Sequence, residues 1–271
     1  MRYGLREIAN VMLKTKAPEQ RVGGKMIEKA GTPICHFTSL KTSSIEGAAT
    51  TVYAQGGRGN PRLIAWEGER TLTLTMEDAL ISPMGIALLT GADLIDNEAK
   101  DMVAHITENV DKGTGGKFTL TETPLFTNGL TAWYCELDSE GNPTGSFKEF
   151  TNVDSITVDE NVTAILVDYY YTEQGVTATQ IDIEPGKFGG NYYLEAETLM
   201  RDEATGKDDA AEFILPNCKI QSNFTFSMGA SGDPSTFTFT VDAFPGVIKG
   251  GSASKKVLCA IQIIPDTTAG E

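Results

Sequence analysis

Hydrophobic and polar residues alternate along several stretches of the chain, and a period of two residues is the pattern of a β-strand with one buried face. In Ser235–Pro245, for example, Phe237, Phe239 and Val241 fall on one face and threonines on the other. Further strand-like stretches are Thr50–Gln55, Arg62–Met76, Gly190–Asp202, Ala211–Met228 and Lys255–Ile264. The pattern predicts a mainly β protein, an antiparallel β-sandwich or barrel.

Two glycine positions interrupt this pattern near residue 60. The segment Gly56–Pro61 reads GGRGNP, and glycine and proline cannot continue a strand ladder there, so we expect a turn or a flexible loop. Gly68 is expected to form a kink or a turn between two separate strands, the second of which has Leu72 and Leu74 on one face.

One segment departs from the two-residue period. Thr75 and Asp78 have the spacing of a capping box, Ser82 and Pro83 have the order of an N-cap and a first helical residue, and Gly91 is placed as a C-terminal glycine. We therefore expect one flanking helix, or a kinked pair, over about residues 77–90. Its apolar side must pack against a sheet, and that side comprises Ala79, Leu80, Ile86, Leu88 and Leu89.

Residues 113–185 form a separate group of short strand-like runs with glycine-rich stretches at both ends. We expect an inserted β-sandwich-like module here, and a main β core with the packed helix made from residues 1–112 and 186–271. The runs are Lys117–Leu125, Gly129–Asp138, Ser155–Glu160, Thr163–Glu173 and Thr177–Pro185, with turn signals at Asn128-Gly129, Glu140–Pro143 and Glu173–Gly175.

The first thirty residues are polar and cationic, in contrast to the rest of the chain. The stretch Arg6–Lys14 fits a short helix with Ile8, Val11 and Met12 on one side, which Pro18 would end. We expect an arm that becomes ordered against a neighbouring molecule, or a frayed terminus.

The net charge and the spacing of the cysteines argue against some classes of function. The 271 residues carry 22 basic and 37 acidic side chains, a net charge of −15, whereas a protein that grips nucleic acid needs a basic face. The four cysteines are far apart and form no CxxC pair, so buried thiols are expected rather than a metal or redox site. The N-terminus lacks the apolar region of a signal peptide, and no run is long enough for a membrane anchor, so a cytoplasmic site of assembly is expected.

Three motifs resemble functional sites, and each has a simpler structural interpretation. Thr205-Gly206-Lys207 lacks the upstream glycine and the following Ser or Thr of a phosphate-binding loop, and a hairpin turn is expected instead. Asp138, Glu140 and Asn142 alternate like calcium ligands but fit a β-turn better. Neither His36 nor His105 has a nucleophile partner in a recognisable context. We expect no catalytic residue, no metal ligand and no cofactor.

Two long blocks of the sequence resemble tail tube proteins of tailed bacteriophages. The first, residues 56–92, reads GGRGNPRLIAWEGERTLTLTMEDALISPMGIALLTGA: a Gly-rich loop, a strand, an acidic-Gly kink, a Thr-rich strand and a helix. The second, residues 199–244, includes the RDEATGKD hairpin, the strand around Leu215–Lys219 and the motif Gly232–Phe237. The two blocks cover about a third of the chain, and they contain no chemistry.

The resemblance implies a structural subunit of a virion tail. Such subunits assemble into stacked hexameric rings around an inner β-barrel, and a carboxylate-lined lumen would let genomic DNA pass without specific binding. The implied partners are other copies of the chain and tail proteins such as a sheath or a terminator. The N-terminal arm and the loop Gly56–Asn60 are the segments expected to contact neighbouring rings or a sheath.

Two other functions stay open from the sequence. A capsid decoration or head–tail joining protein would have similar strands but would not polymerise alone. A glycan-binding or glycan-cleaving β-sandwich would use Trp133, Tyr134 and the carboxylates of residues 138–142, and Tyr169, Tyr170 and Tyr171 leave room for it.

Overall fold

The computed structural model describes residues 2–5, 7–96, 102–127, 129–173, 178–231, 235–251 and 255–265. The chain divides into two compact units, residues 1–95 with 181–271, and residues 96–180. Where the chain passes between them, β8 (Asp93–Asp96) and β13 (Thr179–Asp182) form a two-stranded sheet. Arg6, Asn128, Gln174-Gly175 and Gly232–Pro234, which entered the sequence predictions, lie outside the described residues.

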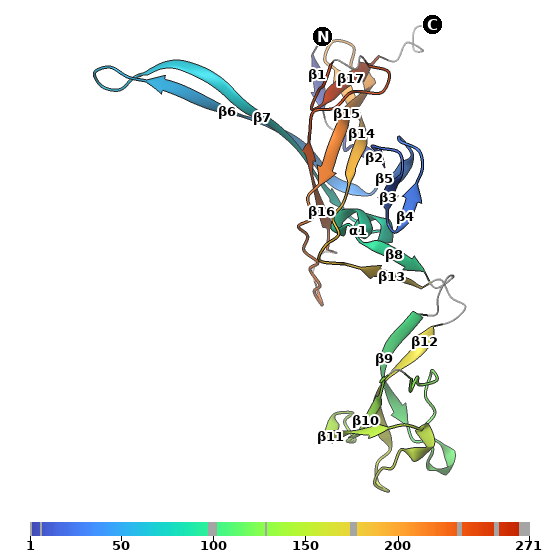
Figure 1. Cartoon of the computed structure of the whole chain (residues 1–271). Helices are drawn as coiled ribbons and strands as arrows, with labels where there is room; N and C mark the ends of the chain where they lie inside the picture. The colour runs from blue at the N-terminus through green and yellow to red at the C-terminus, as the bar shows by residue number, and fades with distance from the viewer. Residues whose placement is uncertain are drawn as a thin grey trace. The chain divides into compact units, whose positions relative to one another are not determined.

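The first unit is built on a nine-stranded sheet, and every pairing recorded for its described residues is antiparallel (Figure 1). The strand order is β5-β2-β14-β15-β16-β7-β6, with β1 beside β14 and β17 beside β15. The bounds are β1 Tyr3–Leu5, β2 Asn10–Thr15, β5 Pro33–Phe37, β6 Leu40–Gln55, β7 Arg62–Asp78, β14 Asn191–Asp202, β15 Asp208–Ile220, β16 Phe237–Ala243 and β17 Ala260–Ile264. A separate small hairpin joins β3 (Gln20–Val22) to β4 (Lys25–Ile27).

One face of this sheet forms the hydrophobic core. Alternate residues of the central strands are at most 1% exposed, among them Leu13, Leu194, Leu215 and Val241. The rings of Phe37 and Phe239 meet edge to face, with centroids 5.0 Å apart. The predicted alternation in the 235–245 segment is thus confirmed, and it follows from burial of one face of an antiparallel sheet.

The helix α1 (Pro83–Thr90) packs on the core face through Leu88 and Leu89. The predicted start signal at Ser82-Pro83 and the predicted C-terminal glycine are confirmed. Ser82 is the N-cap, and its hydroxyl accepts a hydrogen bond from the Gly85 N–H at 3.0 Å. Gly91 closes the helix in the left-handed conformation, with φ of 74°.

The first part of the predicted helix is wrong. Residues up to Asp78 belong to β7, because this stretch pairs with β16 and β6 across the sheet. The Asp78 carboxylate accepts hydrogen bonds from the Ser39 hydroxyl at 2.5 Å and the Leu80 N–H at 3.2 Å, which fixes the chain between strand and helix. Leu80, assigned to the packed side, is 70% exposed.

The helix and the arm predicted for the N-terminus are also wrong. The segment Asn10–Thr15 is β2, an interior strand between β5 and β14, and Val11 and Leu13 lie in the core. The sheet supplies partners on both sides of this segment, and these outweigh a weak helical pattern.

An ion cluster fixes the chain next to α1. The Asp93 carboxylate receives the Arg21 guanidinium at 2.8 Å and the Lys187 ammonium at 2.7 Å. Hydrogen bonds from these two cations, Arg21 first, lower the pKa of Asp93 to about 2. Asp93 therefore stays ionised well into acid, and it joins β3 to the residues that follow β13.

The second unit contains a four-stranded antiparallel sheet, order β11-β10-β12-β9, in its described residues. The strands are β9 Met102–Asp111, β10 Ala132–Leu137, β11 Pro143–Phe150 and β12 Ala164–Glu173, and two short 3₁₀ turns lie at Thr114–Gly116 and Val153–Ser155. One face buries Ile165, Val167 and Tyr169, against which Phe118 and Phe150 pack.

Two strand predictions in this unit fall on runs that are paired on both sides. Those for Gly129–Asp138 and Thr163–Glu173 are confirmed as β10 and β12. Lys117–Leu125 and Ser155–Glu160 are not strands; they cross the buried face as irregular chain and pack apolar side chains such as Phe118 and Ile156 on it. The strand β9 was not predicted.

Candidate assembly surface

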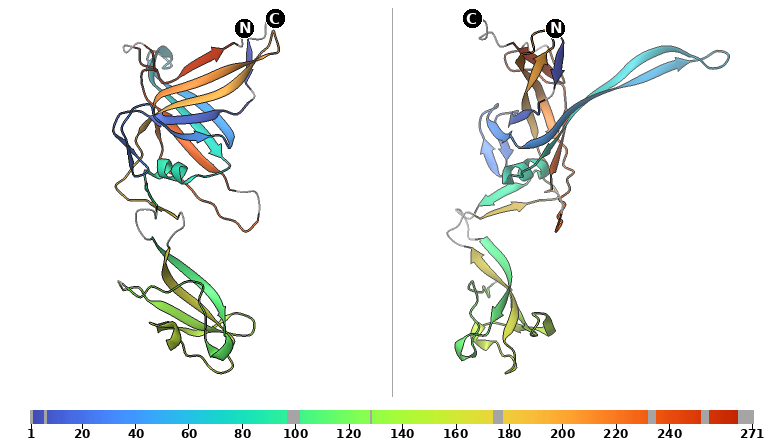
Figure 2. Two further views of the ribbon diagram at one scale, coloured as in Figure 1. Left: turned by 90° about the vertical axis from the view of Figure 1, so that its right-hand side faces the viewer. Right: turned by 180° about the vertical axis from the view of Figure 1, so that it is seen from behind.

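The distal halves of β6 and β7 form a two-stranded ribbon that extends beyond the rest of the sheet (Figure 1 and Figure 2). The β6–β7 pairing runs out to Gln55 opposite Arg62, whereas β16 pairs with β7 only over Thr73–Asp78. Residues 57–71 are all exposed. Because an isolated two-stranded ribbon is marginally stable in water, the ribbon calls for a partner surface.

One face of the ribbon is apolar. Val52 lies opposite Trp66 and Ala54 lies opposite Ile64, so these four side chains share a face. Val52, Ile64 and Trp66 are more than half exposed, and Trp66 is 53% exposed. We call these four residues the apolar stripe, and exposed apolar surface of this kind marks an interaction site.

Two glycine-containing sites in the ribbon were the subject of sequence predictions. Its tip is a tight turn, as predicted, in which Gly57, Gly59 and Asn60 have positive φ and the Asn60 N–H donates to the Gly57 carbonyl at 3.1 Å. The strand does not end at Gly68, so the turn, one of the two predicted alternatives, is wrong and the kink is confirmed. The register with β6 shifts there, and a bulge bends one continuous strand.

The second feature is the face of the nine-stranded sheet opposite the core, which we call the open face. In β14 and β15, Glu197 lies directly opposite Glu212, and Glu195 is two residues from Glu197 on the same face. Lys14 of β2 pairs with Glu195. Burial, then Glu195 and Glu197, raise the pKa of Glu212, so carboxylates here outnumber the nearby cation.

Hydroxyl and carboxylate groups continue the open face across β16, β7 and β6. Thr238 lies opposite Glu77, Thr240 opposite Thr75 and Asp242 opposite Thr73. The Thr42 hydroxyl also donates to the Glu77 carboxylate at 3.2 Å. The open face is therefore polar across β16, β7 and β6 and acidic around Glu197 and Glu212, while apolar residues such as Leu199 and Ile214 also lie on it.

The Thr205-Gly206-Lys207 motif is the turn between β14 and β15, as predicted. The Gly206 N–H donates to the Asp202 carbonyl at 2.9 Å, and Gly206 has a φ of 69°. The Thr205 hydroxyl donates to the Asp202 carboxylate at 3.1 Å. Because these groups form hydrogen bonds within the turn, they do not form a phosphate-binding site.

The calcium-like motif is also a turn, between β10 and β11. The Asp138 carboxylate accepts hydrogen bonds from the backbone N–H groups of Asn142 and Glu140, at 2.8 and 2.9 Å, and these lower its pKa. No group of three or more His, Cys, Asp or Glu residues in the described part of the chain is placed to hold a metal ion. His36 is a strand residue of β5.

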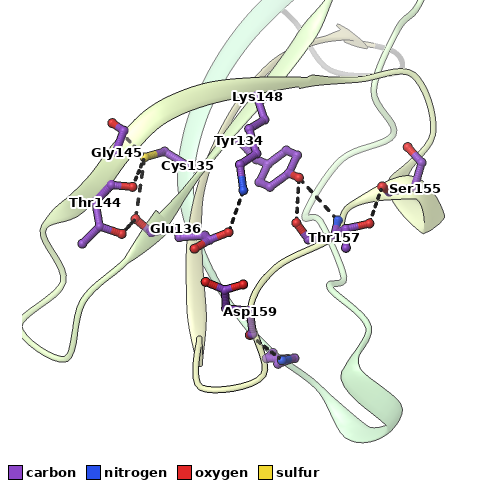
Figure 3. Close-up of polar contacts among 10 residues, drawn as sticks. Tyr134, Cys135, Glu136, Thr144, Gly145, Lys148, Ser155, Thr157 and Asp159 are labelled. Atoms are coloured by element: carbon purple, nitrogen blue, oxygen red, sulfur yellow. Dashed lines mark hydrogen bonds and ion pairs between the residues drawn. The ribbon is translucent and has the colours of Figure 1, made fainter.

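Trp133 and Tyr134, which the sequence suggested as one sugar site, lie on opposite faces of β10. Tyr134 is buried and donates its hydroxyl to the Thr157 carbonyl at 2.8 Å, while Lys148 bonds Glu136 at 2.9 Å beside it (Figure 3). The Cys135 thiol contacts the Thr144 carbonyl at 3.3 Å where β11 bulges. That combination of Trp133, Tyr134 and the 138–142 carboxylates is therefore not brought together.

The cysteines are free thiols, with Cys135 and Cys218 buried and Cys35 and Cys259 half-buried. Burial raises the pKa of Cys218 to about 12 and that of Cys35 to about 11, which keeps both as unreactive thiols. No helix in the described residues has the length and apolar character to cross a membrane.

A protein-family model, the YomU/Tube protein family, matches residues 25–254. The match includes the ribbon, α1, the whole second unit and β14 to β16. No curated protein gives a significant match to the chain.

Proposed function

Because the chain belongs to the YomU/Tube protein family, a phage tail tube family, we propose that it is a structural subunit of a phage tail tube. Copies assemble into hexameric rings, the rings stack, and the resulting pipe conducts DNA through an acidic lumen. The main support for this proposal is that a chain of this family has both an acidic sheet face and an exposed apolar ribbon.

The open face is the proposed wall of the lumen. Glu195, Glu197 and Glu212 place negative charge at the centre of the sheet, with Lys14 as the cation paired to Glu195. A negative wall repels the phosphate backbone and gives no site at which counterions would be displaced. The threonines of β16 and β7 extend a neutral, hydrated surface on the β16 side of these glutamates.

The ribbon is the proposed contact with neighbouring copies. Its apolar stripe leaves large side chains in water in the single chain, and burial of such area stabilises an interface by about 25 cal/mol per Å². The sheet ends at β5 and β6, and strand edges of this kind pair readily with another chain. Both features are explained if identical copies complete them.

The remaining partners follow from the same proposal. The tube contacts other tail proteins such as a sheath or a terminator, and it resides in the virion tail without enzymatic activity. We further propose that the second unit, which contains β9 and most of residues 113–185, is a module inserted into the chain of the core.

Negative-stain electron microscopy of the purified full chain tests the function. Rings or tubes with a central channel are the expected result. Particles that stay single at high concentration and bind only capsid lattices would instead support a decoration or joining protein, and would refute the tube.

The charge of the lumen gives a second test. The double variant Glu197→Lys, Glu212→Lys keeps two like charges opposite each other, so its cross-strand repulsion matches that of the original pair. Tubes of this variant are expected to retain DNA, with an affinity that falls steeply as salt rises.

The matched control is Glu140→Lys, Glu160→Lys, which makes the same charge change at two exposed positions of the second unit. Filter binding over a salt series is the measurement. Equal DNA retention by both variants would show that net charge alone, and not the open face, controls DNA contact.

A further inference from the structure

The four-stranded sheet of the second unit has one face covered by other segments of the chain and one exposed face, and the exposed face carries aromatic rings. Trp133 and Tyr170 are each 37% exposed on it. Their neighbours along the strands, Tyr134 and Tyr169, point to the covered face and are buried. An open antiparallel sheet face usually carries polar residues, so exposed rings at its centre call for a function.

Strand register places polar groups on both sides of each ring. One row crosses all four strands in the order Glu149, Trp133, Asp168, Thr107. The next row sets Tyr170 opposite His105, with ring centroids 5.1 Å apart. We call these six residues the aromatic face.

Hydrogen bonds hold the aromatic face in place before any ligand binds. Oδ1 of Asp168 receives Nε2 of His105 at 2.8 Å and the Thr107 hydroxyl at 2.7 Å. The indole N–H of Trp133 donates to the Thr131 hydroxyl at 3.0 Å. Within the described residues, Oδ2 of Asp168 has no recorded partner, which leaves an oriented acceptor beside the indole.

We propose that the aromatic face binds a neutral oligosaccharide built of pyranose units. The apolar C–H face of a pyranose ring packs on an aromatic ring, while its rim hydroxyls need acceptors and donors close by. Here the acceptors are Asp168 and Glu149, one on each side of Trp133, and Tyr170 provides a second ring two residues from Asp168 along β12.

The charge of the row selects among ligands. Two carboxylates beside Trp133 repel an anionic glycan or a nucleic acid. A cationic ligand would need only the carboxylates and the rings of this face. The face also carries the hydroxyl groups of Thr107 and Tyr170, which can both donate and accept hydrogen bonds, and these suit a neutral ligand rich in hydroxyl groups.

The chain offers a direct reporter, because its only two tryptophans are Trp66 and Trp133. In the full-length Trp66→Phe variant, all tryptophan emission comes from Trp133. Titration with maltohexaose, cellohexaose and chitohexaose is expected to shift this emission and saturate for at least one of them, with a Kd in the millimolar range or below. Asp168→Asn in the same background is expected to weaken that binding at least tenfold.

Ligand-observed NMR on the full chain with only Trp133→Ala supplies the second measurement, and loss of saccharide contact is expected there but not for Trp66→Ala. The inference is overturned if none of the three saccharides shifts the emission up to about 10 mM. It is also overturned if hexalysine shifts it while they do not, or if the emission depends on protein concentration alone, which would point to a second copy. Tube formation by these variants is scored separately, so the outcome does not depend on the tube proposal.

Discussion

Replacing Trp66 with aspartate is expected to abolish tube formation while leaving the subunit folded. Trp66 lies on the apolar stripe opposite Val52, is 53% exposed, and belongs to neither core cluster. In the assembled tube the same position would be buried against a neighbour, where an unpaired carboxylate costs several kcal/mol per contact. Repeated around every ring, that cost should leave no tubes visible by electron microscopy.

The neighbouring residue supplies the control. Ala65 lies one position along β7, opposite Tyr53, on the other face of the ribbon. Ala65→Asp introduces the same charge into the same strand, and tubes should persist close to the unmodified level. Circular dichroism and thermal unfolding of both variants should match the parent chain. Normal tubes from Trp66→Asp would show that the stripe is not an assembly contact.

The sequence predicted the elements that local patterns specify. Phe239 and Val241 fall on the core face because a two-residue period suits a strand with one buried side. The helix ends were visible because Ser82 and Gly91 each perform a local task, a cap and a left-handed turn. The mainly β fold, with one short α-helix in the described residues, followed from these signals.

The errors arose where distant parts of the chain decide the structure. Met12 and Ile8 suggested a helical face, but β14 and β5 flank this segment and select an extended conformation for Asn10–Thr15. Gly68 suggested an interruption, yet pairing with β6 on the other side of the bulge keeps β7 continuous. The strand β9 is recognised only through its pairing with β12.

The candidate surfaces were the least accessible to prediction. Glu197 and Glu212 are far apart in sequence, and only the β14–β15 register sets them opposite each other. Trp133 was singled out with the wrong partners, because its cross-strand neighbours Asp168 and Glu149 belong to other strands. A shift of one residue in register moves every side chain to the other face, and sequence patterns alone do not fix register to that precision.

Gly91→Ala is expected to be the most destabilising of the single small substitutions in the first unit. Gly91 has a φ of 74°, where a side chain costs about 1 kcal/mol. A Cβ there would also lie 2.5 Å from the carbonyl carbon of Phe188 and 2.6 Å from the Gly189 nitrogen. These are backbone atoms held next to the Asp93–Lys187 ion pair, so they cannot move aside easily.

Displacing this backbone adds about 2 kcal/mol, as overpacking in a tight site does. The total, about 3 kcal/mol, corresponds to a fall in Tm of roughly 6–12 °C for a unit of this size. Gly206→Ala separates the two causes: its φ is 69°, but no atom lies within 4 Å of the added Cβ, so only the conformational cost of about 1 kcal/mol applies. Denaturant unfolding of both variants measures the difference, and equal losses of stability would mean that the contact between α1 and Phe188 is looser than the structure shows.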